Sequence, residues 1–165
     1  MGKKEKELKA VKEGEEQPVK EEASYETKIK FCSVIAKPLA DEKLCKKVLK
    51  LAKKASKRKA IRRGVKEVVK ALRKNAKGIC ILAGDISPVD VLTHIPIICE
   101  DHHVPYIYVP SKEDLGAAAL SKRPTSCMLL LPQPPKGPVD AEEQKEYAEA
   151  YAEAEKKIVA AMPVF

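Results

Sequence analysis

The sequence of 165 residues has no tryptophan, no pair of closely spaced cysteines and no long apolar run. No apolar run approaches the roughly 20 residues that a membrane-spanning helix needs, and the charged N-terminus lacks the apolar core of a signal peptide. Hydrophobic residues still make up 44% of the chain, which is enough for a compact aliphatic core in one domain with tails. We therefore expect a soluble intracellular protein, in the cytosol or the nucleus.

The cysteines do not have the pattern of a disulfide framework. They number five, an odd count, and are spread along the chain without a CxxC motif. Cys80 lies in an Ile-Cys-Ile run and Cys127 precedes Met-Leu-Leu-Leu, and in such settings cysteine acts as a small buried hydrophobe. This pattern indicates a reducing compartment.

Signatures of metal binding and catalysis are also missing. Cys99, His102 and His103 could belong to a metal site, but a structural zinc needs four ligands and no second motif supplies the others. We expect Cys99 in the core and both histidines at a helix end. The GxGxxG and Walker motifs are absent, and no Ser/His/Asp or Cys/His arrangement stands out. We expect no metal, no cofactor and no enzymatic activity, and the alternative is a small-ligand enzyme that uses Asp85.

Positive charge is concentrated in one segment. The formal net charge is +8, but residues 42–77 alone hold twelve lysines and four arginines against Glu42 and Glu67. A block of this kind favours a phosphate backbone or an acidic surface as the partner. The alternative is a solvated lysine-rich face.

Composition divides the chain into four parts. Residues 1–27 alternate lysine and glutamate with few large apolar side chains, so we expect a disordered charged tail. A folded domain follows at residues 28–132, then a proline-rich linker at 133–139 and an acidic helix at 140–165. The sequence leaves open whether this last helix packs on the core or docks on a partner.

Alternating helix and strand patterns predict a three-layer α/β domain. Apolar residues at spacings of four, three and four predict a helix over residues 41–57, and a second helix begins after Gly64. Serine caps at Ser87, followed by a proline, and at Ser111 predict two more helix starts. Short buried strands are expected at residues 79–83, 106–109 and 127–131, and the short link at residues 59–61 is a further strand candidate.

The first candidate site is a cationic helix start that contains one acid. If the second helix begins just after Gly64, then Arg63, Glu67, Lys70 and Lys74 share one face, with Lys66 beside them. A helix N-terminus and cations attract phosphate, while the carboxylate can accept hydrogen bonds from a guanine edge. Ordinary A-form RNA hides its base edges, so such a face needs a bulge, a loop or a non-canonical pair. The alternative is an Arg63–Glu67 ion pair on a solvated helix.

The second candidate site is the basic, proline-containing turn over residues 120–125. Lys122 and Arg123 supply its charge, and Gly116 with the alanines after it permits close backbone approach. The alternative is an ordinary surface loop.

Four ordered motifs resemble the kink-turn RNA-binding ribosomal protein family, over residues 30–132. The motifs are Arg62-Arg-Gly-Val-Lys-Glu-Val-Val-Lys70, Ile81-Leu-Ala-Gly-Asp-Ile-Ser-Pro88, His94-Ile-Pro-Ile-Ile-Cys-Glu-Asp101, and Val104-Pro-Tyr-Ile-Tyr-Val-Pro-Ser-Lys112 continued by Leu115-Gly-Ala-Ala. The resemblance implies a three-layer α-β-α sandwich with a short mixed central sheet. Within the family the chain most resembles the members found in box H/ACA ribonucleoprotein particles.

The resemblance also implies which residues bind RNA. The family pattern Gly-x-Asn-Glu-x-x-Lys falls on Gly64, Lys66, Glu67 and Lys70, with Lys66 in place of the asparagine. In the family these residues contact the sheared G·A pairs of a kink-turn, and the loop near residues 120–125 covers the bulged nucleotides. Because an ammonium attracts phosphate but offers no acceptor, we expect broader RNA binding, with specificity supplied by protein partners. The predicted RNA-binding residues are Arg62, Arg63, Gly64, Val65, Lys66, Glu67, Lys70, Lys74, Leu120, Ser121, Lys122, Arg123 and Pro124.

The function implied by the resemblance is non-catalytic. The protein would be a core subunit of nuclear and nucleolar box H/ACA particles, which guide pseudouridine formation in ribosomal RNA and serve ribosome biogenesis. Its partners would be box H/ACA guide RNA, a pseudouridine synthase subunit and a small bridging protein, with no membrane contact and no small-molecule substrate. Alternatives are a ribosomal or other kink-turn-binding protein of the same fold, or a protein-interaction module whose basic helix binds an acidic partner.

Overall fold

The computed structural model of the chain describes residues 24–133 and 141–162. Its elements, in chain order, are α1 Tyr25–Lys30, α2 Glu42–Lys57, β1 Ile61–Arg63, α3 Val65–Leu72, β2 Ile79–Ala83, α4 Asp90–Asp101, β3 Tyr106–Val109, α5 Lys112–Ala118, β4 Cys127–Leu130 and α6 Ala141–Ala161. The strands form one four-stranded sheet in the order β1-β4-β2-β3. β2 and β3 are parallel and the other two pairs are antiparallel, so the sheet is mixed, as predicted.

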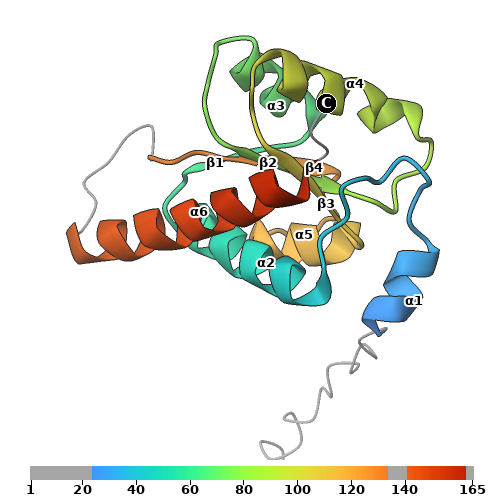
Figure 1. Cartoon of the computed structure of the whole chain (residues 1–165), viewed down its shortest axis with the longest axis horizontal. Coiled ribbons are helices and arrows are strands. Elements are labelled where there is room, and N and C mark those ends of the chain that lie inside the picture. Colours follow the sequence, from blue (N-terminus) through green and yellow to red (C-terminus); the bar gives the residue numbers. More distant parts are fainter. Residues whose placement is uncertain (1–23, 134–140, 163–165) are drawn as a thin grey trace, which may run out of the picture.

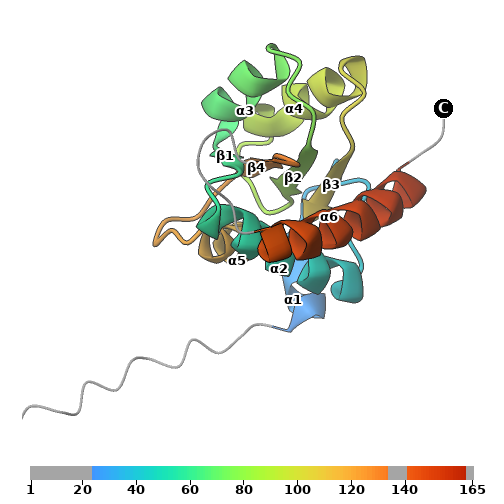
Figure 2. The same cartoon turned by 90° about the vertical axis from the view of Figure 1, so that its left-hand side faces the viewer.

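Helices cover both faces of the sheet. α3 and α4 lie on one face, and α2, α5 and α6 lie on the other (Figures 1 and 2). Side chains alternate along each strand, so Ile79 and Ile81 join the core on the α2 side while Cys80 and Leu82 join the core on the α3 side. The predicted three-layer α-β-α sandwich is therefore confirmed. No helix in the described part of the chain is long and apolar enough to cross a membrane.

α2 has the extent that its apolar spacing predicted. Val48, Leu51 and Ala55 are buried against the sheet, and the lysines between them are exposed. The helix ends where Lys59 takes a positive φ of 55° and the Ala60 N–H donates to the Ala55 carbonyl at 2.9 Å. After this ending β1 begins only at Ile61, the last residue of the 59–61 link that was the strand candidate.

The two serine caps have different outcomes. The Ser111 hydroxyl accepts from the Asp114 N–H at 3.3 Å, so the predicted cap of α5 is confirmed. The predicted cap at Ser87 is wrong, since α4 begins at Asp90 with Val89 as its N-cap. Ile86 packs against both halves of the core, which holds the chain in a turn before it enters the helix.

The folded part of the chain starts earlier than the predicted residue 28. α1 begins at Tyr25 after the cap Ser24, the Tyr25 hydroxyl donates to the Ala40 carbonyl, and Lys28 forms an ion pair with Asp114 at 2.6 Å. These contacts link α1 to the domain. The rest of the predicted tail, and all of the predicted linker except Gln133, lie outside the described residues.

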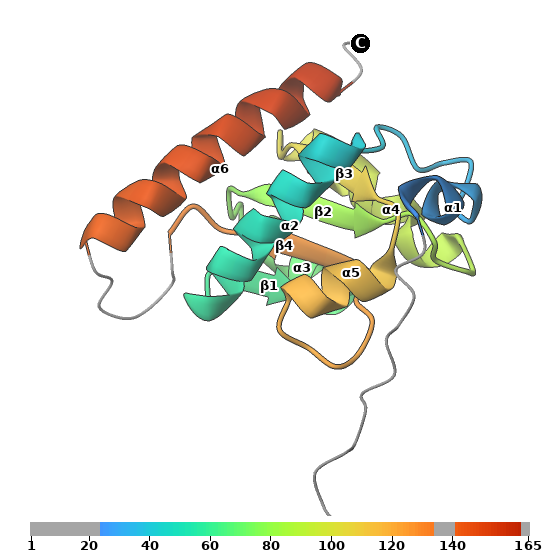
Figure 3. The same cartoon turned by 90° about the horizontal axis from the view of Figure 1, so that it is seen from below.

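The structure settles the packing of the acidic helix, which the sequence left open. α6 folds back on α2, with Tyr147, Tyr151 and Ile158 buried in the core on that side (Figure 3). Two ion pairs join the helices at their edge, Lys47–Glu153 at 2.8 Å and Lys54–Glu146 at 3.3 Å. Hydrogen bonds from Lys157 and Lys47 lower the pKa of Glu153 to about 2.

A single hydroxyl tests this docking. The Tyr147 hydroxyl donates to the Leu131 carbonyl at 2.8 Å, so Tyr147→Phe should lower the free energy of unfolding by about 1 kcal/mol. Urea denaturation measures the change. The matched control is Tyr151→Phe, since that hydroxyl has no hydrogen bond among the described residues, and it should shift stability by under about 0.5 kcal/mol. Equal losses in both variants would contradict this role of Tyr147.

Candidate nucleic-acid interface

Gly64 makes an abrupt transition from the edge strand β1 into α3. Its φ of +87° lies in the region that strongly favours glycine, and it is the N-cap of the helix. Its N–H donates to the Cys127 carbonyl at 2.9 Å, and its carbonyl accepts from the Val68 N–H at 3.0 Å. The helix start is therefore held against the first residue of β4.

Glu67 is held at this helix start by the backbone. Its carboxylate accepts a hydrogen bond from the Arg63 N–H at 3.3 Å, and its side chain is exposed. The alternative ion pair with the Arg63 guanidinium does not occur among the ion pairs of the described residues. The carboxylate is thus oriented, and it keeps acceptor capacity for an outside donor.

The predicted four-residue helical face is wrong at both ends. Arg63 precedes α3, and Lys74 follows its C-cap Arg73. In the sheet register Arg63 is opposite Met128, which packs in the core on the α2 side. Arg63 therefore points to the α2 side of the edge strand, because directly opposed residues share a face. The side to which Arg63 points is set by the pairing of β1 with β4, which spacing within a helix cannot reveal.

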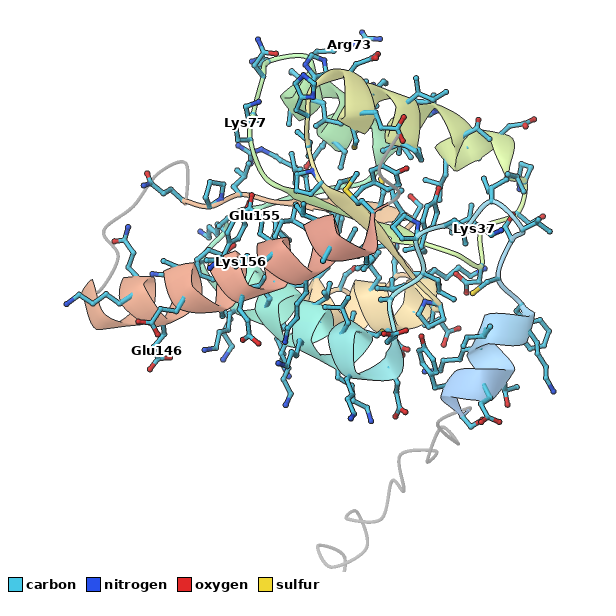
Figure 4. The ribbon with its side chains drawn as sticks, in the orientation of Figure 1. Lys37, Arg73, Lys77, Glu146, Glu155 and Lys156 are labelled. Carbon is cyan, nitrogen blue, oxygen red and sulfur yellow. The ribbon has the colours of Figure 1, made fainter. Side chains whose placement is uncertain are left out.

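Cations gather instead along α3 and the turn after it. A hollow of about 470 Å³ lies between α3 and α4. It is lined by Val65, Lys66, Val69, Lys70, Arg73, Lys74 and His94. Sequence reasoning missed Arg73 and His94. Arg73, which is labelled in Figure 4, could have been found from its i, i+4, i+7 spacing with Lys66 and Lys70. His94 could not have been found in this way, because it belongs to another helix, α4.

The turn at residues 120–125 packs tightly on α5. A Cβ on Gly116 would clash with the Arg123 carbonyl oxygen and lie 3.1 Å from the Pro124 Cα. The Thr125 N–H donates to the Lys112 carbonyl at 3.1 Å. The predicted close backbone approach is confirmed. It leaves Leu120, Lys122, Arg123 and Pro124 exposed and Ser121 half-buried.

The two candidate segments meet at one edge of the sheet. The turn leads directly into β4, which pairs with β1, and Cys127 at the start of β4 binds Gly64 (Figure 3). The ion pairs formed within residues 24–133 and 141–162 use none of the cations of either segment. These cations are Arg62, Arg63, Lys66, Lys70, Arg73, Lys74, Lys122 and Arg123. The two segments therefore carry unneutralised positive charge, and Glu67 is the one acid in their sequences.

The side chains weighed for other chemistry have structural positions. Asp85 accepts from the Lys112 N–H at 2.9 Å and so ties the end of β2 to α5. Cys99 is fully buried and His102 caps the end of α4, as predicted. Burial raises the pKa of the Cys127 thiol to about 12, far from that of a nucleophile. Among the described residues no group of three or more His, Cys, Asp or Glu side chains could hold a metal ion.

Comparison with known proteins gives consistent matches. The model of the ribosomal protein L7Ae/L30e/S12e/Gadd45 family matches residues 46–134. The H/ACA ribonucleoprotein complex subunit 2-like protein of Xenopus tropicalis is 48% identical over 141 residues, which cover 86% of this chain and 87% of that protein. The Arabidopsis thaliana protein of the same name is 51% identical over 109 residues, 66% of this chain and 70% of that protein. Among solved structures, the Giardia lamblia 15.5kD RNA binding protein aligns with a TM-score of 0.66 and 31% identity, covering 77% of this chain and 97% of that one.

Proposed function

The chain belongs to the ribosomal protein L7Ae/L30e/S12e/Gadd45 family, and on this premise we propose that it is a non-catalytic, RNA-binding core subunit of box H/ACA ribonucleoprotein particles. The similarity to the Xenopus tropicalis relative extends well beyond the 46–134 range of the family model, since it covers 86% of the chain. In this role the protein helps guide pseudouridine formation in ribosomal RNA, in the nucleus and nucleolus.

The observation that carries the proposal is the unneutralised cationic edge around Glu67. The cations bind phosphates of a structured RNA, and the α3 N-terminus adds its partial positive charge. The Glu67 carboxylate, oriented by the Arg63 N–H, accepts hydrogen bonds from a base edge exposed in a bulge or a non-canonical pair. The turn at residues 120–124 covers the nucleotides beside it.

The protein in this role does not perform the chemistry of the particle. A separate pseudouridine synthase subunit performs it, and a small bridging protein connects that subunit to this chain. This chain binds the RNA and orients it.

Replacing Lys66 tests how permissive the interface is. Lys66 is exposed on the first turn of α3, so its ammonium attracts any phosphate, while asparagine offers an oriented acceptor and donor instead. Lys66→Asn should therefore increase the ratio of kink-turn affinity to hairpin-loop affinity, by roughly 5- to 10-fold for one gained polar contact. Parallel titrations of the two RNAs measure this ratio. An unchanged ratio would show that Lys66 does not set selectivity.

Purification of the complete chain from cells, followed by RNA sequencing and protein identification, tests the proposed function. The expected result is enrichment of box H/ACA RNAs together with a pseudouridine synthase. The Giardia lamblia RNA binding protein shares this fold, so the second candidate is an RNA-binding protein of another ribonucleoprotein particle. Enrichment of other structured RNAs without a synthase would support that candidate and overturn the first.

A further inference from the structure

α2 carries a row of lysines on its outer side. Lys50, Lys53 and Lys57 are spaced at i, i+3 and i+7, so they lie along one strip of the helix surface. All three are exposed, and none takes part in the ion pairs formed by the described residues. We call these three residues the α2 strip.

The acidic helix α6 neutralises a different edge of α2. Glu153 and Glu146 pair with Lys47 and Lys54, which lie seven residues apart on the side next to α6. Figure 4 labels Glu146 near the N-terminal end of α6. The α2 strip therefore keeps its charge although an acidic helix packs beside it.

On its other side the C-terminal half of α2 lies against α5. The Ser56 hydroxyl, next to Lys57 in the chain, donates to the Ala118 carbonyl at the end of α5, at 2.9 Å. The acids of α5 lie at its opposite end, where Asp114 pairs with Lys28. The α2 strip is therefore close to the end of α5 from which the basic 120–125 turn starts (Figure 3).

The strip is also continuous with the candidate interface through the edge strand. Lys59 in the α2–β1 connection is exposed, and Arg63 points from β1 to the α2 side of the sheet. Positive charge thus runs from α3 around the β1 edge, past the turn, and onto α2.

We propose that the α2 strip binds the phosphate backbone of the same RNA that the α3 interface recognises, on the stem that leads away from the recognised feature. This inference rests on the proposed function and extends its footprint to the opposite face of the sheet. The strip binds RNA without sequence specificity, since lysine contacts to phosphates position a nucleic acid but do not distinguish its bases.

The surface fits RNA better than an acidic protein. Protein interfaces are built around apolar or aromatic anchors, but none of the exposed large hydrophobic residues in the described part of the chain lies on α2. A row of lysines without such an anchor has the chemistry of a phosphate contact.

The test is a salt titration of RNA binding by the full chain and by the Lys50→Gln, Lys53→Gln, Lys57→Gln triple variant. The probe is a hairpin RNA with a kink-turn and a long stem. Because each phosphate contact contributes about 0.7–0.9 to the slope of log affinity against log salt, the triple variant should have a slope shallower by about 2. If the two lines meet near 1 M salt, its affinity at 0.1 M salt should be roughly 100-fold lower.

A matched triple removes the same charge elsewhere. Lys30, Lys37 and Lys156 are exposed on α1, the segment before α2, and α6 (the last two are labelled in Figure 4), and their change to glutamine should leave the slope within about 0.5 of wild type. An equal decrease of the slope in both triple variants would show that the effect depends on net charge alone, and it would overturn the proposed role of the α2 strip. An unchanged slope in the strip variant, with Glu67→Ala still impaired, would overturn the strip and leave the proposed function intact.

Two further outcomes distinguish the remaining possibilities. Failure of the wild-type chain to bind any structured RNA would overturn the proposed function and the strip with it. Loss of binding to poly-glutamate in the strip variant, with RNA binding unchanged, would assign the strip to an acidic protein and overturn the RNA proposal.

Discussion

Glu67→Ala is expected to weaken binding to a kink-turn RNA by roughly 5- to 150-fold while changing binding to plain duplex RNA by under about twofold. The first range corresponds to about 1–3 kcal/mol, the cost of leaving a desolvated base donor without its acceptor. Plain duplex RNA does not expose such an edge, so it loses nothing, and removal of one negative charge among cations favours it slightly. Fluorescence anisotropy with both RNAs measures the two affinities.

Two variants control this experiment. Glu67→Gln keeps an oxygen that can accept from the Arg63 N–H, so it should retain more kink-turn affinity than the alanine variant. Lys66→Ala removes a phosphate contact and should weaken both RNAs alike. If Glu67→Ala and Lys66→Ala each weaken all RNAs equally, Glu67 does not read a base edge.

Gly116→Ala is expected to destabilise the fold and to impair RNA binding together. The new Cβ would clash with the Arg123 carbonyl and crowd Pro124, both of them backbone atoms, so the 120–125 turn must shift away from α5. Overpacking of this kind costs about 1–3 kcal/mol, which corresponds to a fall in melting temperature of roughly 2–12 °C for a chain of this size. Because the shifted turn carries Lys122 and Arg123, RNA affinity at 0.15 M salt should fall by roughly 10- to 30-fold for two displaced phosphate contacts.

Calorimetry and RNA titration of the same preparation measure both effects. The matched control is Ala117→Ser, an exposed position on the same helix, where added atoms meet solvent and stability should change by under about 0.5 kcal/mol. Normal melting and normal affinity in Gly116→Ala would contradict the fixed position of the turn.

Local sequence patterns were sufficient to predict most elements of the fold. The apolar spacing along α2 and the short buried runs of β2, β3 and β4 predict their own secondary structure, because each run buries its side chains against a neighbouring layer. The start of α4 could not be predicted in this way. Its serine-proline signal is overruled by the packing of Ile86 between two core clusters.

The candidate site was predictable where it depends on one segment. Gly64, Glu67 and the loop that packs on Gly116 follow from residue type and spacing. The orientation of Arg63 depends on the β1–β4 register, and the place of His94 depends on the packing of α4 against α3. Neither is encoded locally.

The docking of α6 changes the charge available on α2, which composition alone could not predict. The net positive charge of the 42–77 segment does not translate into uniform attraction for a polyanion, since α6 neutralises Lys47 and Lys54. What remains for RNA is the α3 edge, the 120–125 turn and the α2 strip. The distribution of unpaired cations therefore defines the expected footprint better than the total does.

The most direct test of RNA binding at the α3 start and the 120–125 turn is an NMR titration of the isotope-labelled full chain with a box H/ACA guide hairpin. We expect the largest amide chemical-shift changes on Gly64, Val65, Lys66 and Glu67 and on residues 120–124, where the α3 start and the turn meet. Changes confined to α4 and the exposed side of α6, with the Gly64 and Glu67 amides unmoved, would contradict it.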